Sequence, residues 1–129
     1  MRFNFSQKKK ILIVDDEIDI LNNLSKILKR AGYSVLVAQF GKEVLDLAIK
    51  NKPDLIILDV LLPDISGPQI AVKMSEIEDL KNIPIIFLTG IFSKEEEEKT
   101  HGIIANRTVI SKPCDRDTLL KAIHNKINP

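Results

Sequence analysis

Residues 11–17 read Ile-Leu-Ile-Val-Asp-Asp-Glu, an apolar run of strand length that ends in three acids. Two further runs have a similar form, because Leu55–Leu58 is followed by Asp59 and Ile85–Leu88 by Thr89-Gly90. Short, continuously apolar runs are typical of parallel strands buried on both faces. The residues that follow neighbouring parallel strands meet at one edge of the sheet. The sequence therefore predicts a polar crevice at that edge.

Helical patterns separate the strand-like runs. The expected strands are Ile11–Val14, Tyr33–Ala38, Leu55–Leu58, Ile83–Leu88 and Thr108–Ser111. Apolar residues recur at helical spacing from Ile18, Val44, Ile70 and Leu119 onward. This alternation predicts an α/β fold, a doubly wound five-stranded parallel sheet of flavodoxin-like order 2-1-3-4-5 with about five helices. Between Phe92 and Ile103 there is no apolar residue, so the fourth helix is expected to be short or mobile.

Composition is that of one ordinary domain, which we expect to span residues 1–129, with a tail over 1–8 and a core over about 9–127. The chain is 44% hydrophobic and 29% charged, and its formal net charge of +1 gives no overall signature of polyanion binding. One cysteine, Cys114, fits a reducing compartment. The apolar runs are far shorter than the ~18–20 residues of a membrane span. A cytoplasmic protein is therefore expected.

The predicted crevice has the composition of a hard-cation site. Three carboxylates, those of Asp15, Asp16 and Asp59, raise one another's pKa unless a cation compensates them. Oxygen ligands favour Mg²⁺, with Mn²⁺ as the alternative, over Zn²⁺. Asp16 and Asp59 are expected as direct ligands, and Asp15 as a ligand directly or through water. A backbone carbonyl just after Asp59 is a further candidate ligand.

A carboxylate beside a metal can accept a phosphoryl group as an aspartyl phosphate. The Lys112 ammonium and the Thr89 hydroxyl, each at the end of a separate expected strand, would neutralise the equatorial oxygens. Pro113 favours a rigid turn, for which a cis peptide bond is suited, that aims Lys112 inward. Taken singly, these residues have simpler explanations, such as Asp15-Asp16-Glu17 capping the first helix. Their joint placement at four strand ends favours the site.

The same residues resemble the receiver domain of two-component response regulators. Segment 11–17 looks like the first-strand signature of that family, and 59–67, Asp-Val-Leu-Leu-Pro-Asp-Ile-Ser-Gly, like the loop after its phosphorylated aspartate. Leu88-Thr89-Gly90 is similar to the switch-threonine site and Ser111-Lys112-Pro113 to the lysine site. The spacing fits from about Lys9 to Ile127.

The resemblance implies roles for single residues and for partners. The donor would be a histidine kinase or a histidine phosphotransfer protein, and the output a downstream effector protein or a fused output domain. A phosphorylation-dependent homodimer is a further expectation, whereas nucleic acid, membrane and turnover of a separate substrate are not expected. The implied roles are phosphoacceptor for Asp59, metal binding for Asp15, Asp16, Asp59 and the Leu61 carbonyl, switch hydroxyl for Thr89 and phosphoryl-sensing cation for Lys112.

Three departures from the family pattern affect the output. Val109 stands where the family usually has an aromatic switch, and Cys114 where Phe often follows Lys-Pro. The sequence of 95–106 does not follow the family's usual pattern of an alanine- and leucine-bearing helix and a Gly-Ala turn. We therefore predict that the signal passes through ordering of Phe92–Gly102 against Thr89. A second prediction is a long-lived phosphorylated state, because Leu61 and Ile91 stand at the hydrolysis-controlling positions and neither can orient a water molecule.

Two other function classes fit the residues less well. A phosphohydrolase of the haloacid-dehalogenase type needs a second Asp two residues after the nucleophile, and Leu61 stands there. A flavodoxin-like FMN carrier needs a Ser/Thr/Gly-rich loop after the first strand. Asp15-Asp16-Glu17 would instead repel the FMN phosphate. The sequence thus favours a phosphorylatable switching module over either alternative.

Overall fold

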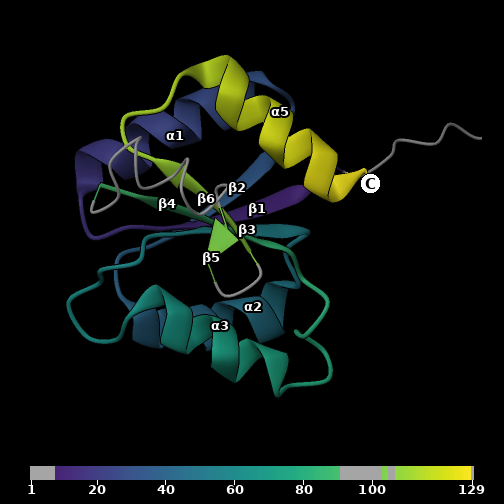
Figure 1. Cartoon of the computed structure of the whole chain (residues 1–129). Helices are drawn as coiled ribbons and strands as arrows, with labels where there is room; N and C mark the ends of the chain where they lie inside the picture. The colour runs from purple at the N-terminus through teal and green to yellow at the C-terminus, as the bar shows by residue number, and fades with distance from the viewer. Residues whose placement is uncertain (1–7, 91–102, 105–106, 129) are drawn as a thin grey trace, which may run out of the picture.

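The computed structural model describes residues 8–90, 103–104 and 107–128 and shows a sheet between two helical layers (Figure 1). Helices α1 and α5 cover one face of the sheet, and α2 and α3 cover the other. The strands are β1 (Lys10–Val14), β2 (Ser34–Ala38), β3 (Leu55–Leu58), β4 (Ile85–Thr89), β5 (Ile103–Ile104) and β6 (Arg107–Ser111). The helices are α1 (Ile18–Arg30), the 3₁₀ turn η1 (Gly41–Glu43), α2 (Val44–Asn51), α3 (Gly67–Ser75) and α5 (Arg116–Ile127).

The sheet has the order β2-β1-β3-β4-β6-β5. Its first five strands are all parallel, so the predicted order 2-1-3-4-5 is confirmed, with β6 as the fifth parallel strand. The short strand β5 is an addition to the expected fold, because it pairs antiparallel with β6 and borders the sheet on that side. The carboxyl ends of β1, β3, β4 and β6 therefore lie along one edge.

Alternate side chains of the central strands pack into two apolar layers, one on each face of the sheet. On β1, Leu12 and Val14 pack toward α2 and α3, whereas Ile11 and Ile13 pack toward α1 and α5. All four are fully or almost fully buried, and each buried side chain of this size stabilises the fold by ~1.5–3 kcal/mol. A site built at their ends is therefore held by the core.

Local signals in the sequence explain most helix ends. The Ser66 hydroxyl caps α3 by accepting the Gln69 N–H, and Pro68 lies in the first turn, where proline is favoured. Asp115 caps α5 by accepting the Thr118 N–H at 2.7 Å. Gly32, with φ of 98°, follows α1 in the conformation that favours glycine. The apolar pattern that begins at Val44 includes Ile49, which is 45% exposed, so the pattern is wrong at that position.

Two expectations fall on parts of the chain that lie outside the described residues. These are the short fourth helix between Phe92 and Ile103 and the ordering of Phe92–Gly102 against Thr89. Val109, by contrast, is 1% exposed and packs in the apolar layer beneath α2 and α3, so no aromatic side chain occupies its position. Among the described residues, no helix is long and apolar enough to cross a membrane.

Candidate functional site

The strand ends carry their polar side chains to one place. Asp15 and Asp59 directly follow β1 and β3, and the Asp59 N–H donates to the Val14 carbonyl at 3.0 Å. Thr89 is the last residue of β4, and its carbonyl accepts the Lys112 N–H at 2.9 Å. These backbone bonds continue the strand pairing by one residue. The crevice predicted from the sequence is therefore present.

Three carboxylates converge at this edge. One oxygen each from Asp15, Asp16 and Asp59 lies within 4.8 Å of the others. Asp15 and Asp59 are 2% and 6% exposed, whereas Asp16 faces solvent. The Glu17 N–H donates to Asp15 Oδ1 at 2.9 Å, and no side-chain hydrogen bond caps α1, so the helix-capping explanation does not hold. The oxygen-only donor set fits Mg²⁺, which uses one or two carboxylates and keeps several waters.

Lys112 provides the positive charge of the crevice. Its Nζ donates to Asp15 Oδ2 at 2.6 Å and to Asp59 Oδ2 at 3.2 Å, and its side chain is 15% exposed. The peptide bond between Lys112 and Pro113 is cis. The Thr89 side chain is fully buried and hydrogen-bonds Asp59. The Asp59 carboxylate thus lies beside a cation and a hydroxyl.

The surroundings shift the pKa of both partners. Burial, the largest influence, raises the pKa of Asp59 above its ordinary value, and the Asp15 charge adds to this while Lys112 and the Thr89 hydrogen bond oppose it. For Lys112, burial alone would lower the pKa. The hydrogen bond to Asp15 and the charges of both carboxylates outweigh burial and raise it. The ammonium therefore stays charged at neutral pH. The ionised form of Asp59, by contrast, lowers the free energy of unfolding.

Replacing Asp59 with Asn is expected to stabilise the metal-free protein. A carboxyl whose pKa is raised on folding contributes stability below its unfolded pKa of about 4, and this contribution is lost as the pH rises through the folded value. Asp59→Asn removes the cost at neutral pH and leaves Lys112 paired with Asp15. We expect the melting temperature to rise by about 4 °C at neutral pH, the effect of ~1 kcal/mol, and by less near pH 4. The measurement is thermal melting of both proteins without metal at the two pH values. An equal rise in melting temperature at both pH values would contradict this prediction.

The loop after Asp59 is closed by a glycine. The Gly67 N–H donates to the Val60 carbonyl at 2.8 Å. A Cβ atom at Gly67 would lie 2.4 Å from the Asp59 carbonyl oxygen, too close for any other residue without a shift. Leu61, in the same loop, has a side chain that is 58% exposed. The role of its carbonyl as a metal ligand stays a prediction.

The same loop is also held by two hydrogen bonds that were not predicted from the sequence. Asp64 Oδ1 accepts the Gly41 N–H at 2.9 Å, and Asp64 Oδ2 accepts the Lys42 N–H at 2.8 Å. A Cβ atom at Gly41 would lie 2.2 Å from the Ile65 side chain, so the two loops meet closely there. The only sequence signal was an acid in a Pro-Asp turn, which does not name its partner. These two hydrogen bonds hold the loop that follows Asp59 in place.

Comparison with known proteins places this site in a family. Residues 11–124 match the family model of the response regulator receiver domain. The chain belongs to the receiver-domain family. Receiver domains are in general phosphorylated on an aspartate, bind Mg²⁺ through an aspartate cluster, and work as signalling domains rather than as enzymes. The aspartate cluster of this receiver domain is Asp15, Asp16 and Asp59.

The relatives include both short and longer proteins. The protein PilH of Pseudomonas aeruginosa is 33% identical over 116 residues, which cover 89% of this chain and 94% of PilH. The phosphate regulon transcriptional regulatory protein PhoB of the same species is 37% identical over 125 residues. That match covers 94% of this chain and 54% of PhoB. The receiver domain thus spans nearly all of one relative and about half of the other.

Solved receiver structures share the fold. A response regulator from Chloroflexus aurantiacus has a TM-score of 0.83 and 31% identity, and the match covers 95% of this chain and 100% of the other. The chemotaxis response regulator CheY4 of Vibrio cholerae has a TM-score of 0.79 and 33% identity, covering 93% of this chain and 99% of CheY4. The family as a whole interacts with histidine kinases and output domains.

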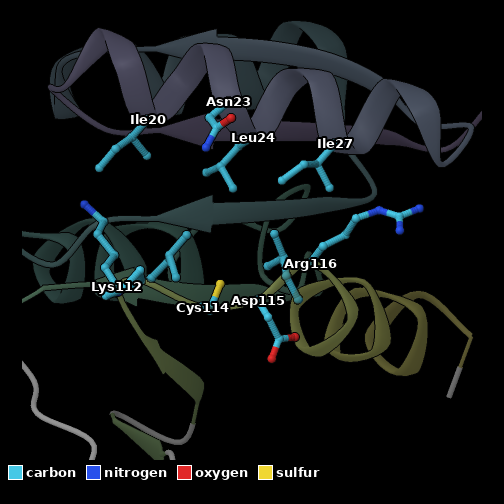
Figure 2. A pocket seen from close by; sticks show the side chains of 11 residues that line it. Ile20, Asn23, Leu24, Ile27, Lys112, Cys114, Asp115 and Arg116 are labelled. Atoms are coloured by element: carbon cyan, nitrogen blue, oxygen red, sulfur yellow. The ribbon is translucent and has the colours of Figure 1, made fainter.

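A hollow of about 170 Å³ adjoins the crevice on the α1 and α5 side of the receiver domain. Figure 2 shows Ile20, Leu24 and Ile27 of α1 pointing toward the side on which Lys112 and Cys114 lie. Its lining is mainly apolar, and the Cys114 side chain is half-buried there rather than buried in the core. The hollow provides apolar surface directly beside the Lys112 stem.

Proposed function

We propose that Asp59 accepts a phosphoryl group from a histidine kinase or a histidine phosphotransfer protein. One observation carries the proposal: the Lys112 ammonium contacts both Asp59 and Asp15 inside a cluster of three carboxylates. A lone strand-end aspartate would need no such partner. The protein would act as a switch and would turn over no separate substrate.

The chemistry follows from the groups around Asp59. A carboxylate oxygen of Asp59 forms a bond to phosphorus as the bond from phosphorus to the donor imidazole nitrogen breaks, and that nitrogen keeps the electron pair. Lys112 can move from the Asp59 oxygen to a phosphoryl oxygen while it stays bonded to Asp15. The Thr89 hydroxyl, already bonded to Asp59, can donate to another oxygen. Each donor is in place before the group arrives, which is electrostatic preorganisation.

We assign the metal to Asp15, Asp16, Asp59 and the Leu61 carbonyl. Bound Mg²⁺ would neutralise part of the charge on the transferring phosphoryl group. Asp16 faces solvent, so it can bind the ion while the ion keeps waters. Asp15 is buried and accepts a hydrogen bond from the Lys112 ammonium. This hydrogen bond would orient the ammonium toward the phosphoryl group. Mn²⁺ suits the same oxygen ligands.

The proposed partners are a donor protein and an output protein or domain, and the proposed compartment is the cytoplasm. The hollow beside Lys112 supplies apolar surface on which the donor protein could rest while its histidine reaches Asp59. The output is a downstream effector protein or a fused output domain, with a phosphorylation-dependent homodimer as one mode and with no direct contact to nucleic acid or membrane. We take residues 1–129 as one receiver domain with its core over about 9–127, acting in the cytoplasm.

The proposal is tested by phosphorylating the full chain with acetyl phosphate. With Mg²⁺, the intact mass should increase by one phosphoryl group. A chelator should prevent the increase, because three carboxylates would then repel the incoming anion. Modification that proceeds equally without a divalent cation would overturn the metal assignment, and no modification at all would overturn the proposed function.

The phosphorylated state is expected to be long-lived. Leu61 lies in the loop after Asp59 and carries no group that can orient a water molecule toward an acyl phosphate. Leu61→Asn supplies an amide there, and we expect hydrolysis to become severalfold faster, toward the ~10²-fold scale of general acid–base assistance. The decay of the phosphorylated mass is the measurement, with Leu61→Met as the matched apolar control. A lifetime that lengthens in Leu61→Asn would contradict the argument; Ile91, the second position, lies outside the described residues.

A further inference from the structure

A groove of about 420 Å³ lies at the opposite end of the sheet, where β1 and β3 begin. One wall is the segment that enters β1, and the other is the turn from α2 to β3. Lys10 joins them, because its N–H donates to Asp54 Oδ2 at 2.7 Å and its carbonyl accepts the Asp54 N–H at 2.8 Å. The described residues that line the groove are Lys8, Lys9, Lys10, Lys50, Asn51, Lys52 and Asp54.

The charges of this groove are not balanced. Five lysines face one aspartate in a chain whose formal net charge is only +1. Lys10 is occupied, because its Nζ donates to the Asn51 carbonyl at 2.9 Å, at the carboxyl end of α2 where a cation is favoured. Within the described residues, none of the other four lysines forms an ion pair. Four exposed ammonium groups therefore surround one hollow without a carboxylate of their own.

Lys52 occupies its position in a conformation that lysine rarely adopts. It ends α2 with φ of 46° and ψ of 65°, in the left-handed region where glycine is the usual residue. A side chain in this region costs free energy that glycine would not. A retained strain of this kind motivates a functional hypothesis for the side chain that bears it.

We propose that this groove binds a compact soluble anion that carries several phosphate groups, at a site separate from Asp59. A concave site with its two walls joined fits a small ligand better than a flat lipid surface. The lining residues that the structure describes include no aromatic side chain to stack on a base and no large apolar side chain to enter a bilayer. Lysine ammonium groups are point charges that suit the dispersed charge of a phosphate chain.

The probe is inorganic tripolyphosphate, titrated into the metal-free full chain at low salt and followed by ¹H–¹⁵N NMR. Shifts should concentrate on Lys8–Lys10 and 50–54. The double change Lys50→Gln with Lys52→Gln should weaken binding by at least about tenfold, since each surface ion pair contributes a few-fold at low salt. The matched control removes two exposed lysines elsewhere, Lys26→Gln with Lys121→Gln, and should change the affinity by less than about twofold.

A single variant separates binding from stability. Lys52→Gly relieves the left-handed strain and removes one ammonium, so the melting temperature should rise by about 4 °C while the affinity falls by roughly fivefold. A loss of binding caused by poor folding could not produce this pair of opposite changes. Wild-type affinity for tripolyphosphate in Lys52→Gly would overturn the proposal.

Two further outcomes would also overturn it. One is tripolyphosphate shifting residues around Asp59 and Lys112 instead of the groove. The other is an anionic phospholipid vesicle or a duplex oligonucleotide binding through the groove lysines where tripolyphosphate does not. Neither outcome touches the proposed phosphorylation, which is read from the intact mass with acetyl phosphate.

Discussion

Lys112→Met should destabilise the metal-free protein by about 3 kcal/mol at neutral pH, which lowers the melting temperature by roughly 10 °C. Lys112 contacts Asp15 at 2.6 Å and Asp59 at 3.2 Å, and both carboxylates are almost fully buried. Removing one partner of a buried ion pair leaves an uncompensated charge, and here it leaves two. Methionine keeps the length and packing of the Lys112 side chain. The loss of unfolding free energy therefore measures the effect of removing the charge.

Two conditions should restore much of this loss. Near pH 4, protonation of Asp59, whose pKa is raised by burial, removes one of the two negative charges. At neutral pH, a divalent cation replaces the missing ammonium. Denaturant unfolding with and without Mg²⁺ is the measurement. The control is Lys26→Met, on the exposed side of α1, which should change the unfolding free energy by less than about 0.5 kcal/mol. A loss in Lys112→Met that is independent of pH would contradict the ion-pair account.

The second large effect concerns the metal. Asp16→Asn should weaken Mg²⁺ binding by about 10- to 100-fold. Loss of a residue that only supports a metal ligand already weakens metal binding by this factor. Asp16 is the exposed member of the carboxylate cluster, so its replacement removes a ligand and a charge with little effect on the core. Calorimetric titration gives the affinity directly and needs no phosphorylated product.

A neighbouring acid is the control for this effect. Glu17 is exposed and follows Asp16, but it does not belong to the carboxylate cluster. Glu17→Gln should therefore change the Mg²⁺ affinity by only about twofold, through long-range charge alone. Similar losses in both variants would show that the ion is held by diffuse negative charge and not by the assigned ligands.

The sequence predicted the parts of the fold that depend on local pattern. Continuous apolar runs located β1 and β3 because buried parallel strands leave no polar position. The polar residues after those runs located the crevice because the carboxyl ends of neighbouring parallel strands meet at one edge of the sheet. The added strand β5 was missed because two residues, Ile103 and Ile104, give no periodic signal. Ile49 fits the helical spacing, but spacing alone does not show which positions of a helix the core covers.

The parts of the site that depend on contacts between distant loops were not predictable. Asp64 and Gly41 are far apart in the chain, and only the folded structure shows that a carboxylate of one loop accepts the N–H of the other. Gly67 belongs to the motif at 59–67, but its close approach to the Asp59 carbonyl is a property of the backbone path. The left-handed conformation of Lys52 is likewise invisible to a pattern that expects glycine there.

The most direct test of the account is to locate the phosphoryl group. The chain is incubated with acetyl phosphate and Mg²⁺, the acyl phosphate is reduced with borohydride, and the peptides are sequenced by mass spectrometry. Because hydride reduces an acyl phosphate to an alcohol, the account predicts homoserine at position 59 in wild-type protein. It predicts none in Asp59→Asn or in the presence of a chelator. Reduction at Asp15 or Asp16 with Asp59 intact, or equal labelling in Asp59→Asn, would contradict the assignment of Asp59 as the phosphoacceptor.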